Sequence, residues 1–205
     1  MQKLLIATHN QGKKRELQDF FSDLPLELVS LSDINVDFDV EEEGTTYEAN
    51  SQKKALTYAK MSGLPAIADD GGLEIAALNG EPGVKSRRWL GYEATDDELA
   101  AHLAKVAKNL PDTNRQAFFR VVLSLALPDG KVWSVAGEVE GIIAKKQLGV
   151  PAPGLPYRTY FYLPEINKYY HEHDLPPEEM KKYNHRYKAA QKLKPIVKKE
   201  VLAGK

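Results

Sequence analysis

The stretch "QAFFRVVLSLALPDGKVWSVAGEVEGIIA", residues 116–144, decides the fold class. Two long runs rich in β-branched and aromatic residues flank Pro-Asp-Gly, a strong turn signal, so the stretch predicts a long β-hairpin. On both sides of it, short apolar runs alternate with segments of helical periodicity. This combination predicts an α/β fold: a central mixed, twisted sheet with long hairpin strands, flanked by helices, in two lobes.

The elements around the hairpin follow from local signals. Apolar runs predict strands over residues 3–8, 26–31, 64–69 and 158–165. Helical periodicity predicts helices over residues 13–24, 45–63, 95–110 and 184–202. Thr95 is a typical N-cap residue and Gly63 a typical C-cap residue, so these two positions should mark helix ends.

Composition excludes several classes of protein. A chain of 205 residues with 42% hydrophobic content can bury a sizeable core, and we expect one domain over residues 1–205. Because 28 basic residues face 29 acidic ones, no overall charge attracts DNA or RNA, and we expect neither as a partner. The absence of cysteine excludes disulfides and thiolate sites. No apolar run approaches the roughly 20 residues of a membrane span, so we expect a cytoplasmic protein without a membrane partner.

Two adjacent carboxylates stand in "AIADDGGLEIAAL", residues 66–78. One interpretation is that Asp69, Asp70 and the glycines after them make a turn between strands. The other is that paired carboxylates at the C-terminal end of a buried strand hold a divalent cation, because hard ions such as Mg²⁺ select carboxylate oxygen. The stretch alone is compatible with both.

The segment "THNQGK", residues 8–13, joins a predicted strand to a predicted helix. Such a turn presents unpaired backbone N–H groups and the positive end of a helix dipole, which favour an anion. Thr8, Asn10 and Lys13 would add a hydroxyl, an amide and a charge. The competing interpretation is that Thr8 and Asn10 are ordinary capping residues and Lys13 an ordinary helix residue.

Three further signals are weak when each is taken alone. The acidic run 41–43 is typical of a solvated loop, and Lys53 and Lys54 are typical of a helix surface. His185 and Arg186 stand together at the start of a predicted helix, where they offer a switchable donor and a planar fork of donors.

The order of these segments is more specific than any one of them. "ATHNQGKKREL" (7–17), an acidic loop before "TYEANSQKKA" (46–55), "LPAIADDGGL" (64–73), "PGVKSRR" (82–88) and "NHR" (184–186) follow one another. In this order the chain resembles the inosine triphosphate pyrophosphatase family over nearly its whole length. With that resemblance, the turn interpretation of Asp69 and Asp70 is set aside.

The resemblance implies an enzyme that hydrolyses deaminated purine nucleoside triphosphates such as ITP, dITP and XTP. The reaction would occur at the α-phosphorus, depend on Mg²⁺ and release a nucleoside monophosphate and pyrophosphate, thereby cleaning the nucleotide pool. A homodimer is implied as well, and so is an active-site cleft between the two lobes. Carried over by position, the family's triphosphate-binding residues fall on Thr8, Asn10, Lys13 and Lys54. Its metal ligands fall on Glu41, with Glu42 beside it, Asp69 and Asp70. Its general base falls on Asp70, with Asp69 and Lys13 as catalytic partners, and the pair that reads the six-position oxygen of the purine falls on His185 and Arg186.

One segment departs from the family pattern. Where relatives carry Phe-Gly-Tyr/Trp-Asp, this chain has Leu155, Pro156, Tyr157 and Arg158, so the aromatic residue is kept and the acidic charge is reversed. Gly71 replaces a usual serine, and Met180 takes a usual lysine position, with Lys181 adjacent. Gly71, Tyr157, Arg158 and Lys181 are therefore expected substrate-binding residues in an altered base-recognition region.

The altered region leaves two alternatives open beside the implied function. The chain could be a pyrophosphatase with shifted base selectivity or a nucleotide-binding protein without turnover. Arg158 itself could read the base beside Arg186, or it could turn out to solvent or onto a phosphate.

Overall fold

The computed structural model describes residues 1–203 and divides into two compact units. Unit 1 takes Met1–Asp70, Val121–Gly137 and the chain from Arg186 onward, and unit 2 takes Gly71–Arg120 and Glu138–His185. The strands are β1 (Gln2–Ile6), β2 (Leu26–Ser30), β3 (Ala66–Ile75), β4 (Gln116–Ala126), β5 (Val132–Ile143), β6 (Phe161–Leu163) and β7 (Lys168–Tyr169). The α-helices are α1 (Gln11–Phe21), α2 (Tyr47–Ser62), α3 (Asp96–Asn109), α4 (Pro177–Tyr183) and α5 (His185–Val197).

The strands form a seven-stranded sheet in the order β2-β1-β3-β4-β5-β6-β7. Strand β1 pairs in parallel with both β2 and β3, whereas β6 pairs antiparallel with β5 and β7. Strands β4 and β5 are neighbours joined by a short turn, as the hairpin stretch predicts. The predicted mixed α/β fold is confirmed.

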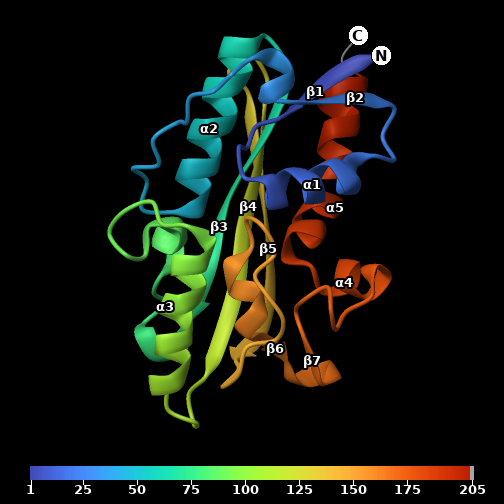
Figure 1. Cartoon of the computed structure of the whole chain (residues 1–205). Helices are drawn as coiled ribbons and strands as arrows, with labels where there is room; N and C mark the ends of the chain where they lie inside the picture. The colour runs from blue at the N-terminus through green and yellow to red at the C-terminus, as the bar shows by residue number, and fades with distance from the viewer. Residues whose placement is uncertain (204–205) are drawn as a thin grey trace. The chain divides into compact units, whose positions relative to one another are not determined.

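Unit 1 buries apolar side chains on both faces of its strands. Leu4 and Ile6 of β1 pack with Leu17 of α1 and Leu193 of α5. Leu5, which lies between them, packs with Tyr58 of α2. Figure 1 shows the same division, with α2 on one side of these strands and α1 and α5 on the other. Because side chains alternate along a strand, neighbouring residues of β1 face different helices.

Unit 2 has a separate apolar core beneath α3. Leu99 and Leu103 of α3 pack with Phe119 of β4, Ile143 of β5 and Phe161 of β6. The rings of Phe119 and Phe161 have centroids 4.6 Å apart. The predicted start of α3 is confirmed, since Thr95 is its N-cap and makes a capping box with Glu98.

The buried Arg115 ties the end of α3 to the end of β5. Its Nη1 donates to the carbonyl of Leu110, its Nη2 to those of Ala107 and Ala144, and its Nε to that of Ile143. The last carbonyls of a helix have no partner within the helix, and a guanidinium with five donors satisfies several at once.

Strand β3 differs from the prediction. It does not end at residue 69 but continues through Asp-Asp-Gly-Gly for ten residues in all. The turn interpretation is therefore wrong, and so is the placement of Asp69 and Asp70 at the strand's C-terminal end. A Cβ at Gly72 would lie 2.3 Å from the carbonyl oxygen of Gly83 and 2.2 Å from Oγ of Ser86. This glycine permits close packing rather than chain reversal.

The strand expected over residues 158–165 is also shorter than predicted. Only Phe161–Leu163 is extended, and Pro156–Tyr160 forms a 3-10 helix. Proline at the first helical position supplies the helical φ angle, which favours this turn over a strand. Helix α4, which opens with Pro177, was not expected from the sequence. Within residues 1–203, no helix is both long and apolar enough to cross a membrane.

Candidate active site

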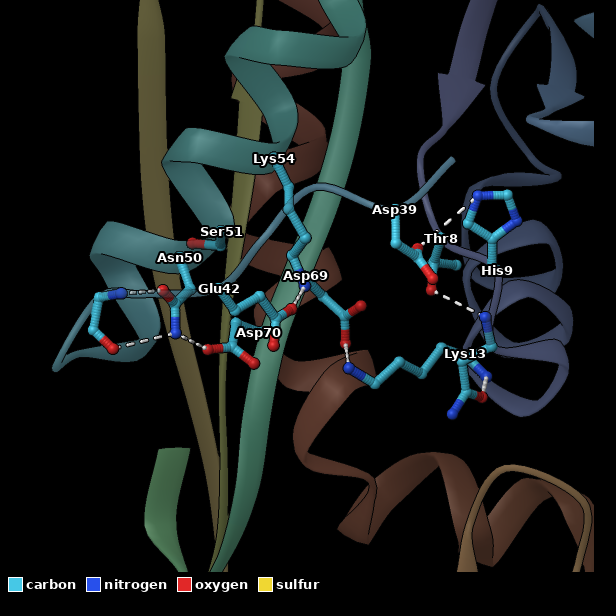
Figure 2. A network of polar contacts seen from close by, with 12 residues as sticks. Thr8, His9, Lys13, Asp39, Glu42, Asn50, Ser51, Lys54, Asp69 and Asp70 are labelled. Atoms are coloured by element: carbon cyan, nitrogen blue, oxygen red, sulfur yellow. Dashed lines mark hydrogen bonds and ion pairs between the residues drawn. The ribbon is translucent and has the colours of Figure 1, made fainter. Parts of the chain in front are cut away.

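The two carboxylates of β3 point to opposite faces of the strand (Figure 2). Ile67 belongs to the core shared with α1 and α5, whereas Ala66 and Ala68 belong to the core shared with α2. The same alternation, continued by one step each, directs Asp69 toward α1 and α5 and Asp70 toward α2. Each carboxylate therefore has its own set of partners.

Asp69 is buried among cations. Its Oδ2 accepts a hydrogen bond from Nε of Arg186 at 3.0 Å and lies 3.2 Å from Nζ of Lys13. Burial on its own would raise the pKa of Asp69, but the charges of Lys13, Arg186 and Lys54 outweigh burial and hold that pKa well below its ordinary value. Its Oδ1 is buried and has no hydrogen-bond partner among the described residues. Asp69 is thus negatively charged at neutral pH, and one of its acceptor atoms is not used by the described residues.

Asp70 has a different environment. Its Oδ2 accepts a hydrogen bond from Nδ2 of Asn50 at 2.9 Å, and Oδ1 of Asn50 accepts from the backbone N–H of Gly44 at 2.8 Å. Burial raises the pKa of Asp70, and the charge of Glu42 adds to the rise, while Lys54 and Lys13 oppose it. A carboxylate of raised basicity that is held by a fixed amide suits a general base.

Lys54 lies against the acidic loop. Its ammonium forms a hydrogen-bonded ion pair with Glu42. Burial disfavours the charged form, but the carboxylates of Glu42, Asp70 and Asp69 outweigh it and raise the pKa of Lys54, so the side chain stays cationic. Lys53 instead pairs with Glu43 at 3.0 Å with both side chains largely exposed, as expected of a helix surface.

The structure distinguishes the first two acids of the loop. Glu41 is exposed, whereas Glu42 is partly buried beside Lys54 and acts electrostatically on Asp70. Glu42 is therefore the loop carboxylate that the structure brings to the Asp69–Asp70 pair. Helical spacing could have indicated that Lys54, and not Lys53, belongs to the site. Asn50 and Lys54 are four residues apart, so they share one face of α2.

The turn before α1 has the geometry of a helix N-terminus. Asn10 is the N-cap, and its Oδ1 accepts from the backbone N–H of Lys13 at 3.0 Å. Oγ1 of Thr8 accepts from the backbone N–H of Asn10 at 3.3 Å. The capping interpretation is therefore confirmed for Asn10, whereas Thr8 contacts the N-cap residue and not the helix itself. It does not exclude an anion at this turn, because a cap satisfies only part of the N–H groups that open a helix.

Arg186 opens the last helical segment of unit 1 and is buried. Besides Asp69, its guanidinium pairs with Glu16 of α1. Lys13 and Glu16 are three residues apart, so one face of α1 holds a cation and an anion that both meet the Asp69–Arg186 pair. Arg186 therefore helps to balance the charge of Asp69. The residues next to Arg186 in the sequence do not indicate this ion pair.

The other predicted substrate-binding residues, Gly71, Tyr157, Arg158, Lys181 and His185, belong to unit 2. Gly71 lies within β3, and Lys181 lies partly buried on α4. The hydroxyl of Tyr157 donates to the carbonyl of Ser86 at 2.5 Å, and burial raises the pKa of Tyr157 above its ordinary range.

Arg158 is buried, which rules out that it turns to solvent and leaves base reading and a phosphate contact as predictions. Its guanidinium carbon lies 4.6 Å from the ring centroid of Tyr170, and its Nη2 lies 3.4 Å from the hydroxyl of Tyr170. That hydroxyl is 3.1 Å from Nδ1 of His185, whose ring stacks on Phe119 with centroids 5.3 Å apart. No local sequence signal identifies Tyr170 or Phe119 as neighbours of His185.

No group of three or more His, Cys, Asp or Glu residues in the described part of the chain is arranged to hold a metal ion by itself. The donor chemistry nonetheless suits a hard cation, because the carboxylates at hand are Asp69, Asp70 and Glu42. Mg²⁺ in nucleotide sites commonly takes one or two carboxylates together with phosphate oxygens and water. The buried, unused Oδ1 of Asp69 is an acceptor of the required kind.

Comparison with known proteins gives one consistent family. A family model described as the Ham1 family matches residues 4–196. A Thermus thermophilus protein named dITP/XTP pyrophosphatase is 42% identical over 191 residues, which cover 93% of this chain and 89% of the relative. A Staphylococcus epidermidis protein of the same name is 36% identical, with 98% of each chain covered.

A solved structure agrees with these relatives. The HAM1 protein of Coxiella burnetii superposes with a TM-score of 0.82 at 34% identity, covering 97% of this chain and all of that one. The match runs through the strand-to-helix turn, the carboxylates of β3 and the His-Arg pair, so it includes the segments on which the resemblance was based. This chain therefore belongs to the Ham1 family.

Proposed function

We propose that this protein hydrolyses deaminated purine nucleoside triphosphates, such as ITP, dITP and XTP, to the nucleoside monophosphate and pyrophosphate. The names of its relatives support the reaction and the substrate class. One observation carries the proposal for this chain: two buried, adjacent carboxylates with opposite pKa shifts stand in a strand flanked by Lys13 and Lys54. Cations beside carboxylates are what a nucleoside triphosphate and an attacking water require.

The roles of the residues follow from their contacts. Asp70, held by Asn50, accepts the proton of the attacking water, whose oxygen forms a bond to the α-phosphorus. The bond between the α-phosphorus and the bridging oxygen breaks, and pyrophosphate leaves with the electron pair. Lys13 and Lys54 offset negative charge on the phosphates, and Asp69 fixes Lys13 and Arg186 at the site.

We further propose a divalent cation as cofactor, with Mg²⁺ the expected metal. When bound, it would neutralise charge on the phosphate oxygens. Asp69, Asp70 and Glu42 are the residues that would hold it. Glu42 replaces Glu41 in this proposal, because Glu41 is exposed and Glu42 lies beside Lys54. The metal is expected to arrive with the nucleotide, which would supply the remaining oxygens.

A second candidate differs only in the base that is accepted. Arg158 stands where relatives are expected to carry an aspartate, and it is buried near His185. A reversed charge there favours a shifted base selectivity within the same chemistry. A nucleotide-binding protein without turnover is less consistent with a buried carboxylate of raised pKa, since mere binding needs no base.

The decisive assay measures nucleoside monophosphate and pyrophosphate released from ITP, XTP, dITP, GTP, ATP and CTP with Mg²⁺. We expect deaminated purines to exceed ATP in kcat/KM by about 5- to 150-fold, which is the value of one good base contact. Release of inorganic phosphate instead of pyrophosphate would contradict the reaction. Binding without turnover would favour the non-catalytic alternative.

Five expectations from the sequence stay predictions. They are the homodimer, the cytoplasmic location, the single domain, the active-site cleft and the lack of a nucleic-acid partner.

A further inference from the structure

A buried chain of polar contacts in unit 2 runs from Arg158 through Tyr170 to His185. The side chains are nearly inaccessible, with exposed fractions of 7% for Arg158, 0% for Tyr170 and 4% for His185. Nη2 of Arg158 faces the Tyr170 hydroxyl at 3.4 Å, and the hydroxyl faces Nδ1 of His185 at 3.1 Å. The Phe119 ring lies 16° from parallel with the His185 ring, which fixes the ring plane.

The chemistry of the three side chains determines which group donates and which accepts in each of these contacts. A guanidinium can only donate, so the Tyr170 oxygen is the acceptor of its contact with Arg158. The Tyr170 hydroxyl keeps a proton of its own to donate, and we take Nδ1 of His185, 3.1 Å away, as its acceptor. The positive charge above the Tyr170 ring makes that O–H a better donor. An Nδ1 that accepts carries no proton. The proton of the neutral imidazole therefore sits on Nε2.

We propose that Arg158 is a positioning residue that acts through Tyr170 to hold His185 in the Nε2–H tautomer and thereby favours six-oxo purines. A donor at Nε2 matches the oxygen at position six of inosine or xanthosine and is mismatched with the amino group of adenosine. The reversed charge at residue 158 thus supports selection of the base without contacting it. The inference rests on the proposed function only in that His185 meets the base.

The tautomer can be measured without turnover, by long-range ¹H–¹⁵N correlation of the histidine rings in the intact protein. His185→Gln assigns the His185 signals among those of the five histidines. We expect the wild type to show a single tautomer with the proton on Nε2. Arg158→Lys should keep that tautomer, because a cationic donor is retained, whereas Tyr170→Phe and Arg158→Met should give a mixture.

Two controls separate positioning from folding. Lys145→Met removes a charge from an exposed side chain of the same unit and should leave the His185 signals unchanged. The signals of His102, which packs edge-on against Trp89 in the same unit, should stay in place in every variant that folds. A wild type with its proton on Nδ1, or the same tautomer in Arg158→Met and Tyr170→Phe as in the wild type, would overturn the proposal.

The selectivity half is tested by the ratio of kcat/KM for ITP to that for ATP. We expect this ratio to fall by about tenfold in Tyr170→Phe and Arg158→Met, within the range of one base contact, and to recover in Arg158→Lys. A changed tautomer with an unchanged ratio would contradict the link to selectivity. If the wild type hydrolyses no nucleotide, the proposed function fails, while the ¹⁵N result still decides whether Arg158 positions His185.

Discussion

Asp69 and Asp70 are consecutive residues of one strand, yet their side chains have different partners. Nζ of Lys13 lies 3.2 Å from Oδ2 of Asp69, and Nδ2 of Asn50 donates to Oδ2 of Asp70 at 2.9 Å. The alternation of a β-strand separates two identical side chains into different electrostatic environments. Burial would raise the pKa of Asp69, but the nearby cations outweigh burial and lower it. Burial raises the pKa of Asp70. Two carboxyl groups whose pKa values are pushed apart can take different roles, and those proposed here are an anchor for Asp69 and a base for Asp70.

Stability should separate the two residues. Asp69→Asn leaves Arg186 buried without its full partner, so we expect the free energy of unfolding at neutral pH to fall by about 3–5 kcal/mol. Asp70→Asn removes a carboxylate whose ionised form is disfavoured by burial, so we expect equal or higher stability. Urea unfolding of the two variants beside the wild type checks this, and a loss in Asp70→Asn as large as in Asp69→Asn would contradict it.

The same difference should appear as a pH dependence. Since the folded pKa of Asp69 is below its ordinary value of 3.8, its stabilisation is present above that value and is lost as the pH falls through the folded pKa. Asp70 has the opposite sign: its contribution is present below 3.8 and is lost as the pH rises through its raised folded pKa. We therefore expect the melting temperatures of wild type and Asp69→Asn to converge only under strongly acidic conditions. A gap that is independent of pH would argue against the ionised anchor.

Catalysis should depend on the other member of the pair. Asp70→Asn keeps the fold and should lower kcat by at least about a hundredfold, as expected for loss of a general base. Lys13→Ala should mainly raise KM, because the role proposed for Lys13 is phosphate binding in the ground state as well as in the transition state. Steady-state kinetics with ITP measure both effects. A near wild-type kcat in Asp70→Asn would move the base elsewhere, with Asp69 the next residue to test.

Neighbouring glutamates provide a matched pair for the metal. Glu42→Gln should raise the Mg²⁺ concentration needed for half-maximal activity, and excess chelator should abolish turnover. Glu41→Gln removes an equal charge from an exposed position and should change this concentration little. A larger rise of this concentration in Glu41→Gln than in Glu42→Gln would make Glu41 the metal ligand. Full activity in excess chelator would refute the metal altogether.

Local signals predicted much of this fold because local physics determines those elements. The hairpin of β4 and β5 rests on long apolar runs around one turn, and the start of α3 rests on Thr95 with its own capping box. The Asp-Asp-Gly-Gly segment was harder to predict, because Gly72 serves a tertiary contact. Gly72 approaches the backbone of Gly83, a residue eleven positions away by sequence number.

The same limit applies to the candidate site. Resemblance identified Asp69, Asp70, Lys13 and Lys54, whose arrangement in unit 1 fits the proposed chemistry. The acidic run could not be resolved by sequence, because Glu41 and Glu42 are chemically identical and only the path of the loop decides which one meets Lys54. The partners of His185 come from distant segments, and no periodicity links them.

The reaction itself is tested most directly by hydrolysing ITP in H₂¹⁸O and locating the label in the products by mass spectrometry. Attack on the α-phosphorus with Asp70 as base predicts ¹⁸O in inosine monophosphate and none in pyrophosphate. Label in the pyrophosphate would mean attack on the β-phosphorus, and formation of inosine diphosphate with labelled inorganic phosphate would mean attack on the γ-phosphorus. Either of these results would contradict the proposed pyrophosphatase reaction.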